Sequence, residues 1–238
     1  MTSSETGLVL LTARLSLAAQ FLFFLVSLIG FFDVSNNSIW NQQYLVSLLI
    51  LEEVSQAIEF SYYFIVSLVL RYPLPTYSRY LDWFFSTPIM LISAIGFMYY
   101  EEMRIATSSD SETILTLTTL WNDKFRSSII SVVLLNAVML ILGFMVEVQR
   151  IPPIYLITAT IAFIGYYIII LIDVGTVSTA ATSLWFYMFI VWGCYGIAAT
   201  QPFGRKNISY NLLDILSKNV YGVFLALYIS TANNIIEN

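Results

Sequence analysis

The sequence contains no histidine and a single cysteine, Cys194, among its 238 residues. Without histidine, the chain lacks the commonest metal ligand in proteins and the side chain that usually carries protons near neutral pH. One cysteine can form neither an intramolecular disulfide nor a cysteine-based zinc site. These absences exclude the usual zinc sites and any proton relay through histidine.

Charged residues are also scarce. They make up 11% of the chain, whereas hydrophobic residues make up 58%; a soluble domain typically has about 25% charged and about 45–50% apolar residues. The net charge of -5 offers no basic surface for nucleic acid. The N-terminus, MTSSETGLVLLTARL, lacks the basic region of a cleaved signal peptide, so we expect the first apolar segment to stay in the mature protein. The apolar surplus predicts an integral membrane protein with the lipid bilayer as its surroundings.

Long apolar segments fill most of the chain, and its length allows about seven spans of roughly 20–25 residues. We therefore predict an all-α membrane protein, a seven-transmembrane-helix bundle that forms a single domain over residues 1–238. Polar or proline-containing segments separate the spans. The predicted spans are Gly7–Phe32, Tyr44–Arg71, Ser78–Tyr100, Arg126–Val148, Pro153–Ile172, Thr182–Thr200 and Ser209–Ser230.

The connection between the third and fourth spans is unusually long and reads EEMRIATSSDSETILTLTTLWNDKF. Ser109 or Ser111 could cap a short helix with Ile114, Leu117 and Trp121 on one face. Because tryptophan favours the membrane interface, we predict a short interfacial helix here. A mobile loop is the alternative.

We expect the N-terminus to be extracellular, although loop charges lean slightly against this orientation under the positive-inside rule. The cytoplasmic loops would then carry Arg104, Lys124 and Arg126, and the outer loops Arg71, Arg150, Arg205 and Lys206.

Several ionisable residues lie inside the predicted spans, where a charge at the bilayer centre costs at least about 2.5–3.5 kcal/mol. Such residues are functional candidates by default. They are Arg14, Glu52, Glu53, Glu59, Arg79, Asp82, Asp214 and Lys218.

Asp214 and Lys218 lie four residues apart in the last span, in NLLDILSKN, and share one helical face. A buried structural ion pair is one interpretation. The other is a lysine that forms a Schiff base in a dry pocket, with Asp214 as the counterion of the buried cation.

The third span carries a matching group in RYLDWFFSTP. Arg79 and Asp82 lie three residues apart, and Ser86 follows one turn later. Asp82 is a candidate second counterion, and Arg79 could balance the two carboxylates. A helix-cap or surface role is the alternative for Arg79.

Together, RYLDWFFSTP and DILSK resemble the third- and seventh-helix signatures of microbial (type 1) rhodopsins, and the resemblance covers nearly the whole chain. It implies a photoreceptor rather than an enzyme, with all-trans retinal as cofactor on Lys218. Trp83 and Ser86 would lie beside the chromophore. WGCYG resembles the family's Trp-x-x-Tyr element and would place Trp192 and Tyr195 there, with Gly196 where the family usually has proline. NAVMLILG resembles the segment around the ionone ring and adds Asn136, Met139 and Gly143.

The second span bears a polar stripe at helical spacing, and carboxylates at such depth usually face a water-filled cavity or an ion path. EEVSQAIE resembles the acidic stretch of channelrhodopsins, and the pattern as a whole is closest to channelrhodopsin-like viral rhodopsins. We therefore expect an ion path, with Glu59 altering the current while leaving the absorption spectrum nearly intact. An alternative is that Glu52 and Glu53 only mark the cytoplasmic entrance of the helix. The expected path residues are Glu52, Ser55, Glu59, Tyr63, Asn211 and Asn219.

Two functions remain open. The first is a light-gated cation channel. The second is a light-driven outward proton pump that lacks the family's cytoplasmic carboxylic proton donor, because Ser93 occupies that position. Cations or protons are the partners in either case. Family members often form homo-oligomers, but no span here indicates an interface.

Overall fold

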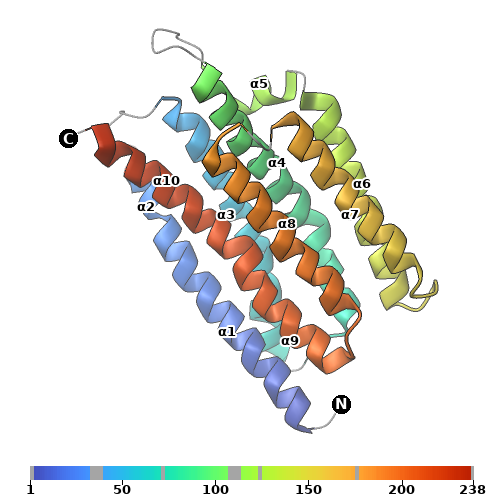
Figure 1. Cartoon of the computed structure of the whole chain (residues 1–238). Coiled ribbons are helices and arrows are strands. Elements are labelled where there is room, and N and C mark those ends of the chain that lie inside the picture. The colour runs from blue at the N-terminus through green and yellow to red at the C-terminus, as the bar shows by residue number, and fades with distance from the viewer. Residues whose placement is uncertain are drawn as a thin grey trace.

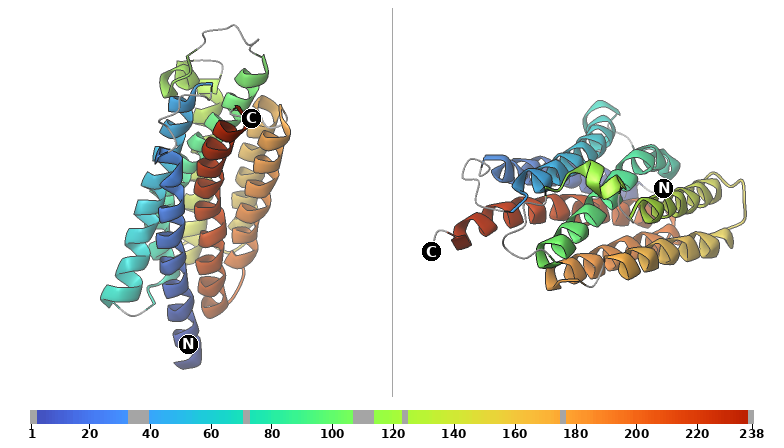
Figure 2. Two further views of the ribbon diagram at one scale, coloured as in Figure 1. Left: turned by 90° about the vertical axis from the view of Figure 1, so that its left-hand side faces the viewer. Right: turned by 90° about the horizontal axis from the view of Figure 1, so that it is seen from above.

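The structure of the protein is a computed structural model, which describes residues 3–32, 40–70, 73–106, 114–122, 125–174 and 177–236. Every regular element over these residues is helical. The long segments run alongside one another in an elongated bundle with the two chain ends at opposite ends (Figures 1 and 2). A predominantly apolar chain without water along its sides favours helices, because each helix satisfies its own backbone hydrogen bonds.

Seven long helical segments lie in the described part of the chain, three of them extended by a short stretch of different helical geometry. The segments are α1 (Ser3–Ser27) with α2 (Ile29–Phe32); α3 (Gln42–Phe64) with the π-helical η2 (Ile65–Leu70); α4 (Arg79–Ala106) after the 3-10 turn η3 (Thr76–Ser78); α6 (Phe125–Glu147); α7 (Tyr155–Asp173); α8 (Thr179–Ala199); and α9 (Phe203–Asp214) with the π-helical η4 (Ile215–Asn219) and α10 (Val220–Ile236).

The helix α4 occupies the centre of the bundle. In its most apolar stretch 67% of the residues are buried, against 22% in α1 and 28% in α6. It packs against α3 and α6, while α1 lies beside α3, α9 and α10 (Figure 1). The inward faces of α4, of the last segment (α9, η4 and α10) and of their neighbours therefore meet around the bundle axis.

Six of the described helices are long and apolar enough to cross a membrane. The helix α3 is not among them, although it runs along the bundle with the others (Figure 1). It carries Glu52, Glu53 and Glu59, and two of these acids, Glu52 and Glu59, are fully buried. The acids lower its mean hydropathy, but Glu52 and Glu59 face the interior and the half-buried Glu53 is bonded to Ser27 of α1.

Several helix ends differ from their predicted positions. The last helix begins at Phe203 rather than Ser209, directly after Pro202, whose fixed φ suits a helix start. The helix α4 continues to Ala106, beyond the predicted end at Tyr100. An ion pair between Arg104 and Glu101, with Nε and Oε1 2.9 Å apart, stabilises this added turn.

In the long connection, the structure has a helix of six residues, α5 (Leu117–Asn122). It contains Leu117 and Trp121, whereas Ile114 precedes it. Its position at the membrane interface stays a prediction. The proposed caps Ser109 and Ser111 lie outside the described residues, as do Arg71 and Lys124.

Candidate functional site

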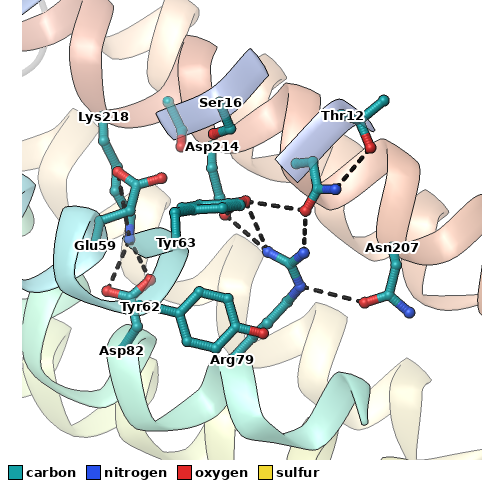
Figure 3. Close-up of polar contacts among 12 residues, drawn as sticks. Thr12, Ser16, Glu59, Tyr62, Tyr63, Arg79, Asp82, Asn207, Asp214 and Lys218 are labelled. Atoms are coloured by element: carbon teal, nitrogen blue, oxygen red, sulfur yellow. Dashed lines mark hydrogen bonds and ion pairs between the residues drawn. The ribbon is translucent and has the colours of Figure 1, made fainter. Parts of the chain in front are cut away.

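Lys218 lies in the middle of the bundle, on the π-helical segment η4, and is 2% exposed. Its Nζ atom is 2.7 Å from Oδ2 and 3.0 Å from Oδ1 of Asp82 on α4. A second carboxylate, Glu59 on α3, lies 3.9 Å from the same nitrogen (Figure 3). Three helices thus meet at one buried amine.

Asp214 takes a different partner from the one its spacing suggests. Its Oδ2 atom is 3.1 Å from Nη1 of Arg79 and accepts a hydrogen bond from the hydroxyl of Tyr63 at 2.6 Å. Its Oδ1 atom accepts from the hydroxyl of Tyr195, also at 2.6 Å. The two predicted counterions therefore divide the two cations: Asp82 contacts Lys218, and Asp214 contacts Arg79.

Arg79 is enclosed by polar and aromatic groups, and at 3% exposure it does not fit a surface role. Its guanidinium donates to Oδ1 of Asn211 and, more weakly at 3.4 Å, to Oδ1 of Asn207 (Figure 3). Three tyrosine rings, those of Tyr62, Tyr63 and Tyr210, surround it at 5.4, 5.5 and 5.7 Å. Such cation–π contacts stabilise a desolvated guanidinium.

The position of Glu59 changes one expectation from the sequence. Three carboxyl groups, those of Glu59, Asp82 and Asp214, here share two cations. Glu59 lies 3.9 Å from the Lys218 nitrogen, so its charge state acts on the electrostatic potential there. Glu59 therefore joins the groups expected to act on the absorption band, and the effect of its loss on the spectrum stays a prediction.

A cavity of about 330 Å³ extends from Lys218 toward α6, α7 and α8. Its lining is mainly aromatic and aliphatic, with Lys218, Ser217 and Thr87 among its few polar side chains. Six of the eight residues predicted to bind the cofactor line it: Lys218, Trp83, Met139, Gly143, Trp192 and Tyr195.

The other two predicted cofactor residues lie behind the wall. Asn136 donates to Oγ1 of Thr87 at 2.8 Å, and Thr87 itself lines the cavity. Ser86 is fully buried one residue earlier on α4, but is not among the lining residues. Both residues are buried directly behind the cavity wall, and their contact with the cofactor stays a prediction.

Sequence reasoning also missed the α7 side of the cavity, where Phe163 and Tyr166 lie. The helix α7 is apolar almost throughout, so its sequence gives no signal for the inner face. Phe189 on α8 and Tyr210 on α9 complete the aromatic wall.

These residues fit an extended apolar aldehyde such as retinal. The cavity lies within the range of about 300–1,000 Å³ usual for ligand pockets. Its walls are apolar along their length, and a primary amine stands at one end with a carboxylate to balance a bound cation. A lysine held in a water-poor pocket is suited to Schiff-base formation.

The predicted polar stripe of α3 faces the bundle interior over its whole length. Glu52, Ser55, Glu59 and Tyr63 are each 0% exposed. Of the facing predicted residues, Asn211 has Oδ1 3.2 Å from the Tyr63 hydroxyl and is joined to Arg79 as described above. The deep burial of Glu52 is inconsistent with a role only at the helix entrance.

A second polar stripe, on α1, was not predicted. Thr12 accepts a hydrogen bond from Nδ2 of Asn211 at 2.7 Å, and Ser27 donates to Glu53 on α3. Between these ends, Ser16 and Gln20 are buried and joined to each other at 3.2 Å. The spacing of four residues was readable in the sequence, but hydroxyls and one amide in an apolar helix are a weaker signal than carboxylates.

Many polar atoms between these stripes have no hydrogen-bond partner in the described part of the chain. Both carboxylate oxygens of Glu52 and both amide atoms of Gln56 and Asn219 are buried in this way. Both carboxylate oxygens of Glu59 and Oε1 of Gln20 likewise have no hydrogen-bond partner among the described residues. Because such atoms are normally satisfied by protein or by water, this region is suited to hold water.

An apolar layer ends the polar region on the side of α5. Beyond Ser93, whose hydroxyl is 3.2 Å from that of Tyr221, the hydrophobic core includes Leu48, Phe97 and Leu225, each 0% exposed. Phe97 packs edge to face on Phe224 at 5.2 Å and on Tyr228 at 5.1 Å. The layer separates Glu52 and Glu59 from that end of the bundle.

No curated protein matches the chain. Among solved structures, it resembles the viral rhodopsin OLPVRII, with a TM-score of 0.74, 18% identity, and coverage of 94% of this chain and 98% of that one. Xanthorhodopsin, described as a light-driven ion pump with dual chromophore, gives a TM-score of 0.72 and 16% identity over 100% of this chain and 98% of that one. A thermophilic rhodopsin gives 0.69 and 20% identity over 100% and 98%.

At these identities the likeness shows the fold, and it confirms the predicted seven-helix bundle. The family is shown by sequence: the model of the bacteriorhodopsin-like proteins matches residues 11–232. The chain is therefore a multi-pass membrane protein of the bacteriorhodopsin-like family, the microbial (type 1) rhodopsins.

Proposed function

We propose that this protein is a light-gated cation channel with all-trans retinal bound as a Schiff base on Lys218. The observation that carries the proposal is the pair of buried polar stripes on α1 and α3. The α3 stripe reaches the Lys218 amine through Glu59, and several polar atoms along the stripes have no protein partner among the described residues.

Retinal, when bound, supplies light absorption and a change of shape. The chain supplies the surroundings. Lys218 holds the chromophore, and Asp82, at 2.7 Å, balances the positive charge of the linkage. The apolar walls, with Trp83 and Trp192 among them, exclude water from the polyene. Since Glu59 also lies near the nitrogen, a change there acts directly on the α3 stripe.

The stripe offers ligands at successive depths. A cation leaving water needs replacement oxygens, and a low-dielectric wall raises the worth of each carboxylate beside it. Glu52 and Glu59 lie about two turns, or roughly 10 Å, apart along α3. Asn219 and Asn211 add neutral ligands on the facing segments, and both are 0% exposed.

The structure suits a closed state, because both ends of this path are sealed. At one end Arg79 fills the space between Asp214 and three tyrosine rings. At the other, the layer of Leu48, Phe97 and Leu225 separates Glu52 from the bundle end. Light would have to displace both for ions to pass.

Photocurrents recorded over a range of membrane voltages test the proposal. A channel gives a steady photocurrent that reverses sign at a voltage set by the cation gradients. Lys218→Ala is the control and should give no photocurrent and no visible absorption band. A photocurrent of constant sign at all voltages would contradict channel activity.

One observation favours a second candidate, the light-driven outward proton pump. Ser93 stands where pumps of the family carry a proton donor, but the fully buried carboxylate of Glu52 faces that serine from α3. Glu52 could supply the proton in its place. In a pump, Glu52→Gln would slow recovery of the photocycle, and external azide, a mobile proton carrier, would restore its rate.

We also propose an extracellular N-terminus. Epitope tags at the two chain ends test this, because an odd number of spans puts them on opposite sides. Labelling of the N-terminal tag on intact cells supports the orientation, and labelling of the C-terminal tag alone contradicts it.

A further inference from the structure

The cavity beside Lys218 reaches the lipid-facing surface between α7 and α8. Three of its lining residues, Thr160 and Ile164 on α7 and Gly196 on α8, are also exposed on the outside of the bundle, Ile164 to 41%. All other lining residues are buried or partly buried. The three exposed residues form a lateral window in the pocket wall.

Small residues keep this window open on the α8 side. A Cβ atom built on Gly196 would meet no atom within 4 Å. One built on Gly193, a turn earlier, would have as nearest neighbours only the ring carbons of Phe163 at 3.8 Å. Neither glycine is required by close helix packing, and neither has a positive φ. Both glycines therefore leave open space between α7 and α8.

By contrast, the pocket is closed near Lys218, on the side that leads toward water. Trp83 packs edge to face on Tyr210 at 5.0 Å and on Tyr195 at 5.5 Å. Beyond them lies the buried Arg79 with its ion pair to Asp214. An apolar molecule coming from water would have to displace a desolvated guanidinium. One dissolved in the bilayer meets Ile164, Gly196 and Thr160, whose hydroxyl is already bonded to the carbonyl of Leu156 at 2.9 Å.

We propose that the window between α7 and α8 is the route by which retinal passes from the bilayer into the pocket, aldehyde end toward Lys218. The inference rests on the proposed binding of retinal to this lysine. It assigns a role to Gly196, which replaces the proline usual in the family, and it identifies the source of the ligand as the membrane.

Retinal dissolved in lipid vesicles, added to retinal-free protein in the same vesicles, tests the route. Gly196→Phe places a ring in the open space, and Thr160→Phe narrows the window from the opposite helix. Each should slow pigment formation on the order of tenfold, which corresponds to about 1.4 kcal/mol in the barrier. Quenching of tryptophan fluorescence, which reports entry into the pocket before the covalent step, should slow equally.

Gly7→Phe is the matched control, since a Cβ on this lipid-facing glycine of α1 also meets nothing within 4 Å, and it should bind retinal at the wild-type rate. Retinal supplied during synthesis should give both window variants a visible band, which shows that the pocket forms. Wild-type rates in both variants would overturn the route and leave the chromophore assignment intact. Failure of the wild-type protein to form any pigment would overturn both.

Discussion

The carboxylates around Lys218 have unequal roles that only the geometry reveals. Asp82 lies 2.7 Å from the lysine nitrogen, Glu59 lies 3.9 Å from it, and Asp214 is held by Arg79 and two tyrosine hydroxyls. At an effective dielectric constant near 20, two unit charges attract by about 5–6 kcal/mol at roughly 3 Å and by about 4 kcal/mol at roughly 4 Å. The two nearer acids should therefore dominate the field at the chromophore nitrogen.

Asp82→Asn should shift the visible absorption band to the red. The carboxylate stabilises positive charge at the nitrogen in the ground state, and its loss narrows the gap to an excited state in which that charge spreads along the polyene. Absorption spectra of the purified pigments measure the shift, with Asp82→Glu as the control that keeps the charge. An unchanged band in Asp82→Asn would mean that the Lys218–Asp82 contact does not persist in the pigment.

Glu59→Gln should move the band as well as alter the current. Its carboxylate acts on the same nitrogen from a greater distance, so the shift should be smaller than that of Asp82→Asn. Glu53→Gln is the matched control, because Glu53 lies six residues, or nearly two turns, before Glu59 on α3 and is bonded to Ser27 of α1. Identical spectra for Glu59→Gln and the wild type would place Glu59 outside the counterion group.

Much of this site was predictable from the residues. Burial of a lysine and several acids in an apolar chain costs enough that they must meet, and helical spacing gave their faces. The pairing was not predictable, because Asp214 and Lys218 are four residues apart yet form ion pairs with different residues of α4, Arg79 and Asp82 respectively. The partner of each acid depends on how α3, α4 and η4 pack together. No local sequence pattern determines that packing.

At the scale of elements, the lengths of the apolar segments predicted seven spans, and charged residues and prolines predicted the breaks between them. The π-helical turns η2 and η4 could not be predicted, since no residue type requires a π-turn. Such turns are frequent at functional sites, and η4 carries both Lys218 and Asn219. The polar stripe of α1 was missed because the helix is otherwise strongly apolar.

Close packing of α2 on α10 gives an element-scale prediction. A Cβ atom on Gly30 would lie 2.9 Å from the Cα of Ala226 and 2.8 Å from Cδ2 of Leu49. Because the backbone of α10 cannot yield cheaply, Gly30→Ala should destabilise the fold by about 1–3 kcal/mol. Thermal loss of the visible band measures the change, and Gly7→Ala on the open face of α1 should melt as the wild type does. Equal melting of the two variants would show that α2 and α10 can separate freely.

The whole molecule consists of a polar interior between two seals, so its conductance depends on the seals as much as on the acids. Arg79 with its tyrosines closes one end, and the aromatic and aliphatic layer around Phe97 closes the other. An apolar constriction of this kind blocks ions by excluding water. A variant that thins this apolar layer without disturbing the chromophore should therefore conduct ions in the dark.

Phe97→Leu should therefore raise the dark conductance or the light-driven current of the channel, and Phe97→Ala should do so more strongly. The ring of Phe97 is fully buried and packs on Phe224 and Tyr228 one turn from Ser93, so its truncation should leave room for water on the side of Ser93 and Glu52. Full truncation also costs about 3–5 kcal/mol of stability, which is why the leucine variant is the more informative.

Phe85→Ala is the matched control on the same helix, because Phe85 is 65% exposed and lies outside the bundle. Currents recorded in the dark and under light at several voltages, normalised to the visible absorbance of each variant, give the comparison. Wild-type currents in both Phe97 variants would show that ions do not pass this layer and that the conducting path leaves the bundle elsewhere.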